Sequence, residues 1–105
     1  MNLQLNGKVA IVTGASRGIG RSIAKILAAE GMRLVVVSRL QKQLDEVAES
    51  FPVETLVVAT DLRDPDAPAT VVDAAIARFG QIDLLVNNAG ATKRGVFLYN
   101  NCFFS

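Results

Sequence analysis

The chain has 105 residues, of which 50% are hydrophobic and 20% are charged, and its formal net charge is +1. This composition is typical of a globular α/β domain. The eleven basic residues are interleaved with ten acidic ones, which excludes a basic block that could follow the phosphates of a nucleic acid, so we expect no nucleic-acid partner.

No part of the sequence has the pattern of a targeting or membrane segment. The first eight residues lack the basic and apolar regions of a signal peptide, and no apolar run approaches the length needed to cross a bilayer. Cys102 is the only cysteine, so no disulfide can form within the chain, and histidine is absent. We expect a cytoplasmic protein with no membrane partner and no metal site.

The first apolar run, Val9 to Thr13, leads into a turn that contains Gly14, Gly18 and Gly20. Residues without Cβ atoms let the backbone turn tightly and approach a ligand closely. An amphipathic pattern follows at once, and the free N–H groups at the start of a helix attract an anion. The segment therefore predicts a strand, a phosphate-binding turn and a helix that begins on this turn.

The glycine spacing differs from that of two common nucleotide-binding patterns. It reads G-x-x-x-G-x-G, whereas the dinucleotide fingerprint reads G-x-G-x-x-G. A P-loop is an alternative, but Ala15 stands where its first glycine belongs, and Arg21 replaces the lysine before Ser22. A glycine turn that binds no ligand is a further alternative.

Strands and helices alternate along the rest of the sequence. Three more apolar runs, rich in Val, Leu and Ile, predict strands buried on both faces: Arg33 to Ser38, Thr55 to Thr60 and Ile82 to Val86. Between the strands, three apolar stripes at helical spacing predict helices, which end near Gly31, Pro52 and Gly80. The stripes are Ile19, Ile23, Ile26 and Leu27; then Leu40, Leu44, Val47, Ala48 and Phe51; then Val72, Ala75, Ile76 and Phe79. We interpret the second and third stripes as core.

This alternation predicts an α/β fold of the Rossmann type, with right-handed crossovers and helices on both faces of a parallel sheet in the spatial order 3-2-1-4. In such a sheet, ligands bind beyond the carboxyl ends of the strands, where the strand order reverses between the first and fourth strands. The turns that begin at Gly14 and Asn87 are expected to meet there.

Three short motifs resemble elements of the short-chain dehydrogenase/reductase family. The segment TGASRGIG, from Thr13 to Gly20, resembles the family's TGxxxGIG signature, and NNAG, from Asn87 to Gly90, resembles a second family element. Asp61 and Leu62 end the third apolar run and resemble the family's acidic element near the adenine. The resemblance covers residues 3 to about 95, which is less than half of a typical family member. We therefore predict a partial dinucleotide-binding domain over residues 1–95.

The resemblance implies a nicotinamide dinucleotide cofactor and a set of residues that bind it. These residues are Gly14, Ser16, Arg17, Gly18, Ile19, Gly20, Ser38, Arg39, Asp61, Leu62, Asn87, Ala89 and Gly90. Two of these roles have a local alternative. Asp61 could begin a turn, because aspartate favours turns and caps, and Asn87 could belong to a turn that only ends a strand.

The residues after the second strand favour NADP(H) over NAD(H). A carboxylate at this place would bind the ribose 2′-hydroxyl of NAD, whereas the sequence has Ser38 and then Arg39, whose guanidinium can hold a 2′-phosphate. Arg17 lies in the glycine turn, which this fold brings beside the same strand end, and a basic residue at each place goes with NADP preference in the family. The alternative is that Arg39 only caps the strand and Arg17 is a solvated loop charge.

The family's catalytic residues have no counterpart in this sequence, so we assign no catalytic residue. The family uses a tyrosine acid/base, a lysine four residues later that lowers its pKa, and a serine. The only tyrosine is Tyr99, with Phe103 four residues later, and Ser16 and Ser38 lie in cofactor elements. The sequence predicts the NADP(H)-binding portion of an oxidoreductase for carbonyl or alcohol substrates, inactive alone. Alternatives are a non-catalytic nucleotide-binding or interaction module and a non-functional truncation product.

Residues 96–105 form an atypical, irregular tail that is rich in aromatic residues and contains Tyr99 and Cys102. The family continues beyond this point into further strands, so we interpret the chain as truncated. The strand from Ile82 to Val86 should then form an exposed sheet edge with unpaired N–H and C=O groups. Such an edge predicts self-association or pairing with another chain.

Overall fold

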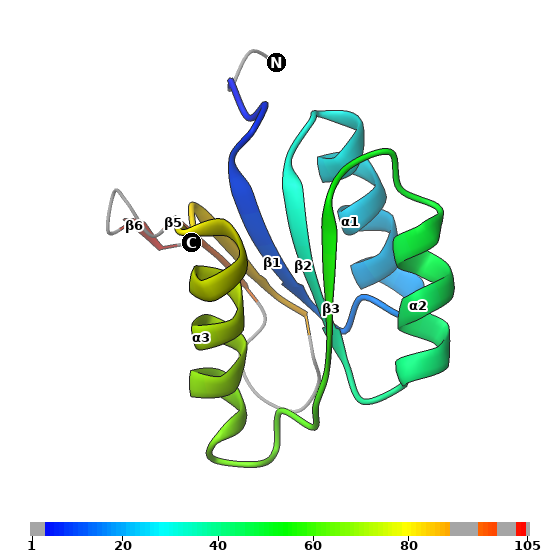
Figure 1. Cartoon of the computed structure of the whole chain (residues 1–105), viewed down its shortest axis with the longest axis vertical. Coiled ribbons are helices and arrows are strands. Elements are labelled where there is room, and N and C mark those ends of the chain that lie inside the picture. Colours follow the sequence, from blue (N-terminus) through cyan, green and yellow to red (C-terminus); the bar gives the residue numbers. More distant parts are fainter. Residues whose placement is uncertain (1–3, 89–94, 99–102, 105) are drawn as a thin grey trace.

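The computed structural model describes residues 4–88, 95–98 and 103–104, and these residues form one layered α/β unit (Figure 1). Apolar β-branched runs form the central strands, and amphipathic segments form the helices between them. In chain order the elements are β1 (Val9–Thr13), α1 (Gly18–Ala29), β2 (Arg33–Ser38), α2 (Gln41–Glu49), β3 (Thr55–Ala59), α3 (Ala67–Phe79), β4 (Leu84–Asn87), β5 (Gly95–Leu98) and β6 (Phe103–Phe104).

The strands form one sheet in the order β3-β2-β1-β4-β5-β6. β1 pairs in parallel with β2 on one side, where Ile11 lies opposite Val35, and with β4 on the other, where Ile11 lies opposite Leu85. β2 also pairs in parallel with β3. The predicted parallel order 3-2-1-4 is confirmed, and the order reverses between β1 and β4 as expected.

The prediction that the fourth strand would form an exposed edge is wrong. β5 pairs with β4 in the antiparallel direction, with Gly95 opposite Asn87 and Leu98 opposite Leu84, and β6 pairs with β5. Extended apolar residues after the fourth strand thus supply the backbone partners that we expected to be missing, because an unpaired strand edge is costly. Part of the tail at 96–105 therefore continues the sheet, and β5 crosses the predicted domain boundary at residue 95. Tyr99 and Cys102 lie outside the described residues.

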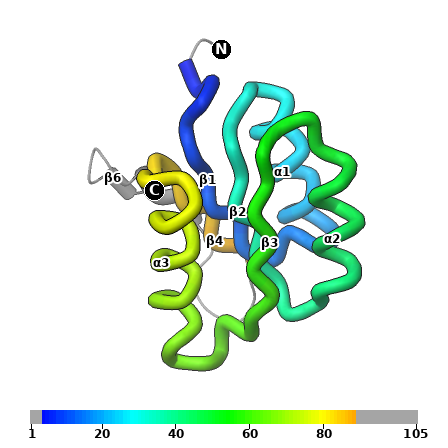
Figure 2. The backbone as a smooth tube through the Cα atoms, in the orientation of Figure 1, coloured from blue at the N-terminus to red at the C-terminus, as the bar shows by residue number. Residues whose placement is uncertain are grey.

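Helices cover both faces of the sheet, as predicted. In Figure 2, α1 and α2 lie on one side of the strands and α3 lies on the other. The core between the sheet and α1 and α2 includes Val12, Leu34 and Leu44. The core on the α3 side includes Ile11 and Val37. All five residues of β1 are buried, because this strand has a neighbour on each side and helices above and below it.

Glycines end the first and third helices at the predicted places. Gly31 follows α1 with a φ of 84°, and Gly80 follows α3 with a φ of 77°, a left-handed conformation that favours glycine. The core stripe predicted on the third helix is wrong at Ile76, which is 46% exposed. The buried positions of α3 are Ala67, Val71, Ala75 and Phe79, spaced four residues apart, so the helix faces the sheet along this stripe instead.

Within the described part of the chain, no helix combines the length and the apolar character that crossing a membrane requires.

Candidate functional site

The turn after β1 requires glycine at three positions for two different reasons. Gly14 and Gly18 each have a φ of 63°, which side-chain-bearing residues rarely adopt. Gly20 lies inside α1, and a Cβ atom there would meet the carbonyl group of Gly14 and lie 2.8 Å from Nδ2 of Asn88. The absence of a side chain at Gly20 lets α1 begin directly against the end of β1.

The amino-terminal end of α1 begins at exposed residues, namely Arg17, Gly18 and Ile19. Arg17 is the N-cap residue, and within the described part of the chain its side chain makes no capping hydrogen bond and the first turn has no acidic residue. The first N–H groups of a helix and its dipole favour an anion at this place. Ile19, in the first turn, is 64% exposed. The turn is therefore suited to hold a phosphate group through backbone N–H groups.

A buried threonine joins the turn after β1 to the turn after β4. The backbone N–H of Asn88 donates to Oγ1 of Thr13 over 2.8 Å. The Thr13 hydroxyl in turn lies 3.3 Å from the carbonyl oxygen of Val86 and 3.2 Å from Oδ1 of Asn87. The expected meeting of the Gly14 and Asn87 turns is confirmed. Ala89 and Gly90, the other predicted residues of the NNAG motif, lie outside the described residues.

We did not assign Thr13 or Asn88 to the site from the sequence. The available signal was one hydroxyl at the end of an otherwise apolar, buried strand, directly before the first glycine. A buried polar group needs a partner, and the turn after the neighbouring strand is where one can be found. Thr13 is thus a structural support for both turns.

The glycine turn is also joined to the carboxyl end of β2. Oγ of Ser38 donates a hydrogen bond to Oγ of Ser16 over 3.2 Å, and the N–H of Ala15 donates to the carbonyl oxygen of Val37, also over 3.2 Å. The residues that follow the two serines, Arg17 and Arg39, are both exposed. The exposed residues Arg17 and Arg39 are therefore carried by backbone segments that these hydrogen bonds hold together.

The turn after β3 contains a charged pair. Asp61 accepts hydrogen bonds from Arg63, with Nη2 2.8 Å from Oδ2 and Nε 3.1 Å from Oδ1. Oδ1 also accepts the backbone N–H of Arg63 over 3.0 Å, so Asp61 does begin a turn, as the alternative interpretation had it. The Arg63 hydrogen bonds lower the pKa of Asp61 to about 2. Leu62 packs its side chain against the core on the α3 side.

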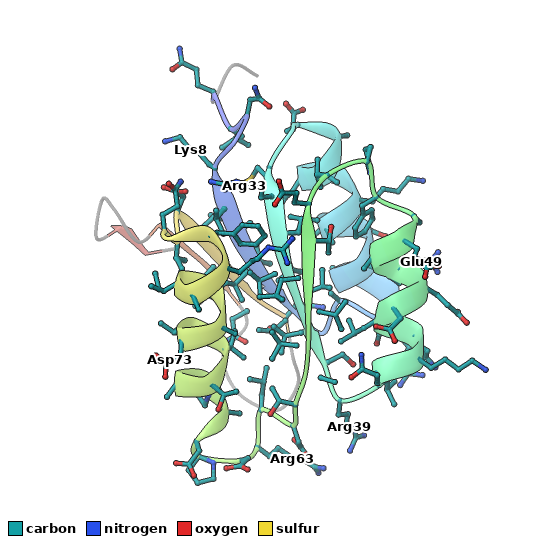
Figure 3. All side chains as sticks on the ribbon, in the orientation of Figure 1. Lys8, Arg33, Arg39, Glu49, Arg63 and Asp73 are labelled. Atoms are coloured by element: carbon teal, nitrogen blue, oxygen red, sulfur yellow. The ribbon has the colours of Figure 1, made fainter. Side chains whose placement is uncertain are left out.

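The carboxyl ends of β1, β2, β3 and β4 thus place those predicted residues that the structure describes at one end of the sheet. Figure 3 shows Arg39 and Arg63 at this end, whereas Lys8 and Arg33 lie at the opposite end. Among the described residues, no group of three histidine, cysteine, aspartate or glutamate side chains could hold a metal ion. The arrangement offers backbone donors for a diphosphate beside cationic side chains, which suits a dinucleotide with an additional phosphate.

Comparison with known proteins supports a dinucleotide site. Residues 8–101 match the family model of short chain dehydrogenases. The L-xylulose reductase of Bos taurus is 48% identical over 99 residues, which are 93% of this chain and 38% of that protein. The chain thus spans little more than a third of the length of this relative.

Two solved structures contain different cofactors. The L-sorbose reductase from Gluconobacter frateurii, complexed with NADPH and L-sorbose, superposes with a TM-score of 0.80 at 41% identity, over 89% of this chain and 37% of that one. A short chain dehydrogenase/reductase from Burkholderia phymatum, in complex with NAD, has a TM-score of 0.81 at 35% identity, over 93% of this chain and 36% of that one.

Proposed function

The chain belongs to the short chain dehydrogenase family, and on this premise we propose that it is the cofactor-binding portion of an oxidoreductase that prefers NADP(H) to NAD(H). Family membership supports a nicotinamide dinucleotide but does not choose between the two, since similar structures contain NADPH in one case and NAD in another. The choice depends on the residues at the end of β2.

The observation that carries the proposal is the contact between Ser16 and Ser38. Their hydroxyl oxygens lie 3.2 Å apart, so the two backbone segments that carry the exposed residues Arg17 and Arg39 are held together. No acidic residue stands at the end of β2, where a carboxylate would repel a 2′-phosphate. Two guanidinium groups at this place can bind such a phosphate with charge-assisted hydrogen bonds.

The other site residues receive roles that match the parts of the cofactor. We propose that Gly14, Gly18 and Gly20 with the first turn of α1 hold the diphosphate, and that Asp61 contacts the adenine. Asn87, with Ala89 and Gly90, would line the cofactor beyond the end of β4. The bound cofactor would supply hydride transfer to a carbonyl or from an alcohol. For the compartment we propose the cytoplasm, because a single cysteine suits reducing conditions.

The cofactor preference is tested by titrating the chain with 2′,5′-ADP and with 5′-ADP in a calorimeter. We expect tighter binding of 2′,5′-ADP. Arg39→Asp should weaken the binding of 2′,5′-ADP by about tenfold or more, because charge-assisted hydrogen bonds to phosphate are lost, and should change the binding of 5′-ADP much less. Lys8→Asp is the control, because it makes the same change of charge on an exposed side chain at the opposite end of the sheet.

Equal affinity of the unsubstituted chain for the two nucleotides would overturn the NADP(H) preference. Enzymatic activity provides a second test of the proposal. None of the 105 residues is a tyrosine followed four positions later by lysine, so we expect the chain by itself to oxidise no NADPH with any carbonyl substrate. Turnover of NADPH by the chain would contradict its assignment as a cofactor-binding portion only.

A further inference from the structure

The Asp61–Arg63 pair lies at the same end of the sheet as Arg39, on the turn after the neighbouring strand. One guanidinium engages both carboxylate oxygens, with Nη2 of Arg63 2.8 Å from Oδ2 and Nε 3.1 Å from Oδ1 of Asp61. The side chain of Arg63 is otherwise open to water, with 73% of its surface exposed. In Figure 3, Arg39 and Arg63 are at the same end of the sheet, on the turns after β2 and β3. These turns belong to paired, adjacent strands.

The charges of these three residues act on one another. Arg63 is the main cause of the lowered pKa of Asp61, and Arg39 contributes a smaller electrostatic attraction in the same direction. The carboxylate therefore lies within the field of Arg39. By the same reasoning, a phosphate dianion bound to Arg39 would be repelled by the carboxylate of Asp61 if that charge were not compensated. Arg63 supplies the compensating charge at hydrogen-bonding distance.

We propose that Arg63 is a specificity-determining residue for the 2′-phosphate that acts through Asp61. Its guanidinium holds the carboxylate in the turn and cancels its charge, so that Asp61 can stand next to the adenosine end of the cofactor without opposing the phosphate bound at Arg39. Arg63 is in this sense a positioning residue that needs no contact with the cofactor. The inference rests on the proposed NADP(H) preference, because NAD(H) has no 2′-phosphate for Asp61 to repel.

The test is the affinity of Arg63→Gln for 2′,5′-ADP and for 5′-ADP, measured by calorimetric titration of the full 105-residue chain. We expect the affinity for 2′,5′-ADP to fall about fivefold, as is usual for a single uncompensated charge near the surface, and the affinity for 5′-ADP to change less than about twofold. Increasing the salt concentration should reduce the difference. Arg63→Lys keeps the charge and should retain most of the preference.

A double variant separates action through Asp61 from direct contact. In Asp61→Asn with Arg63→Gln, no carboxylate remains to be compensated, so the ratio of the affinities for 2′,5′-ADP and 5′-ADP should return toward that of the unsubstituted chain. Loss of the proposed adenine contact of Asp61 should weaken the binding of both nucleotides alike. Arg78→Gln is the matched control, since it removes an exposed arginine from another ion pair, 3.6 Å from Glu54. This control should leave the preference between the two nucleotides unchanged.

The outcomes distinguish the inference from the function on which it rests. If the unsubstituted chain shows no preference for 2′,5′-ADP, the NADP(H) proposal fails and the inference fails with it. If the preference exists but Arg63→Gln lowers the affinities for 2′,5′-ADP and 5′-ADP equally, Arg63 only maintains the fold. The inference alone is then overturned. If the double variant keeps the reduced preference for 2′,5′-ADP seen in Arg63→Gln, the arginine touches the phosphate directly, which also overturns action through Asp61.

Discussion

The hydroxyl groups of Ser16 and Ser38 lie 3.2 Å apart and join the glycine turn to the carboxyl end of β2. Oγ of Ser38 has a second role, because it accepts the backbone N–H of Leu40 over 3.1 Å, just before α2 begins. One side chain thus fixes the glycine turn, the end of β2 and the start of α2 relative to one another. The positions of Arg17 and Arg39 depend on these two contacts.

Removing the Ser38 hydroxyl should affect both stability and binding. Ser38→Ala loses two hydrogen bonds, so we expect the free energy of unfolding to fall by about 1–2 kcal/mol, measured by chemical denaturation. The affinity for 2′,5′-ADP should also fall, because Arg39 is less firmly placed. Ser50→Ala is the control, since the Ser50 hydroxyl donates within its own helix end, to the carbonyl oxygen of Val47 over 2.6 Å. If Ser38→Ala leaves the affinity for 2′,5′-ADP unchanged, Ser38 does not position Arg39.

Gly20→Ala should destabilise the protein although alanine is the better helix former. A Cβ atom at Gly20 would meet the carbonyl group of Gly14 and lie 2.8 Å from Nδ2 of Asn88, so the turn must shift. We expect a loss of about 1–3 kcal/mol in the free energy of unfolding and loss of nucleotide binding, measured by denaturation and titration.

Gly18→Ala provides the comparison for Gly20→Ala. A Cβ atom at Gly18 meets nothing within 4 Å, so the substitution introduces only the strain of a φ of 63°. This strain costs about 1 kcal/mol. If Gly20→Ala is as stable as the unsubstituted chain, the close approach of α1 to the turn is not required.

Thr13→Val should weaken the junction between β1 and β4. The substitution keeps the shape of the side chain but leaves the N–H of Asn88 without its acceptor in a partly buried place. We expect a loss of about 1–3 kcal/mol in the free energy of unfolding, measured by thermal or chemical denaturation. Thr70→Val, at an exposed position of α3, should change stability by less than about 0.5 kcal/mol. Equal effects of the two substitutions would contradict a bridging role for Thr13.

The carboxyl group of Asp61 should titrate near pH 2. Hydrogen bonds from Arg63 lower its pKa from 3.8 to about 2 in the folded chain. Because the folded-state pKa is the lower one, the contribution of this group to stability is complete above pH 3.8 and is lost as the pH falls to about 2. An NMR titration of the side-chain carboxyl carbon measures this directly. Arg63→Gln should raise the pKa toward its ordinary value, and a pKa of 3.8 in the unsubstituted chain would contradict the ion pair.

The parts of the fold that could be predicted from the sequence depend on local patterns. β1 and β2 are continuous apolar runs, and continuous runs indicate strands buried on both faces. Gly31 and Gly80 end helices because a positive φ is a property of a single residue. The Gly14 and Asn87 turns were placed together by the order of strands in a parallel sheet, which follows from the alternation of strands and helices.

The parts that could not be predicted depend on contacts between distant residues or on exact helix rotation. The pairing of β5 with β4 satisfies a strand edge that the local pattern leaves open, and no short motif specifies it. Ile76 is exposed because α3 turns Ala75 and Phe79 toward the sheet. The predicted stripe included Ile76, which is the next residue after the buried Ala75. The Asp61–Arg63 contact depends on the conformation of one turn, which composition does not determine.

The complete burial of β1 has a consequence for the kinetics of local opening. This strand hydrogen-bonds to a neighbour on each side, and all five of its residues are buried. Its amide protons should therefore exchange with deuterium only when the whole domain unfolds, whereas helix ends open more often. Thr13 is the last residue of this strand, and Gly14 follows it directly. The glycine turn proposed to bind the diphosphate is thus expected to start from the most persistent element of the domain.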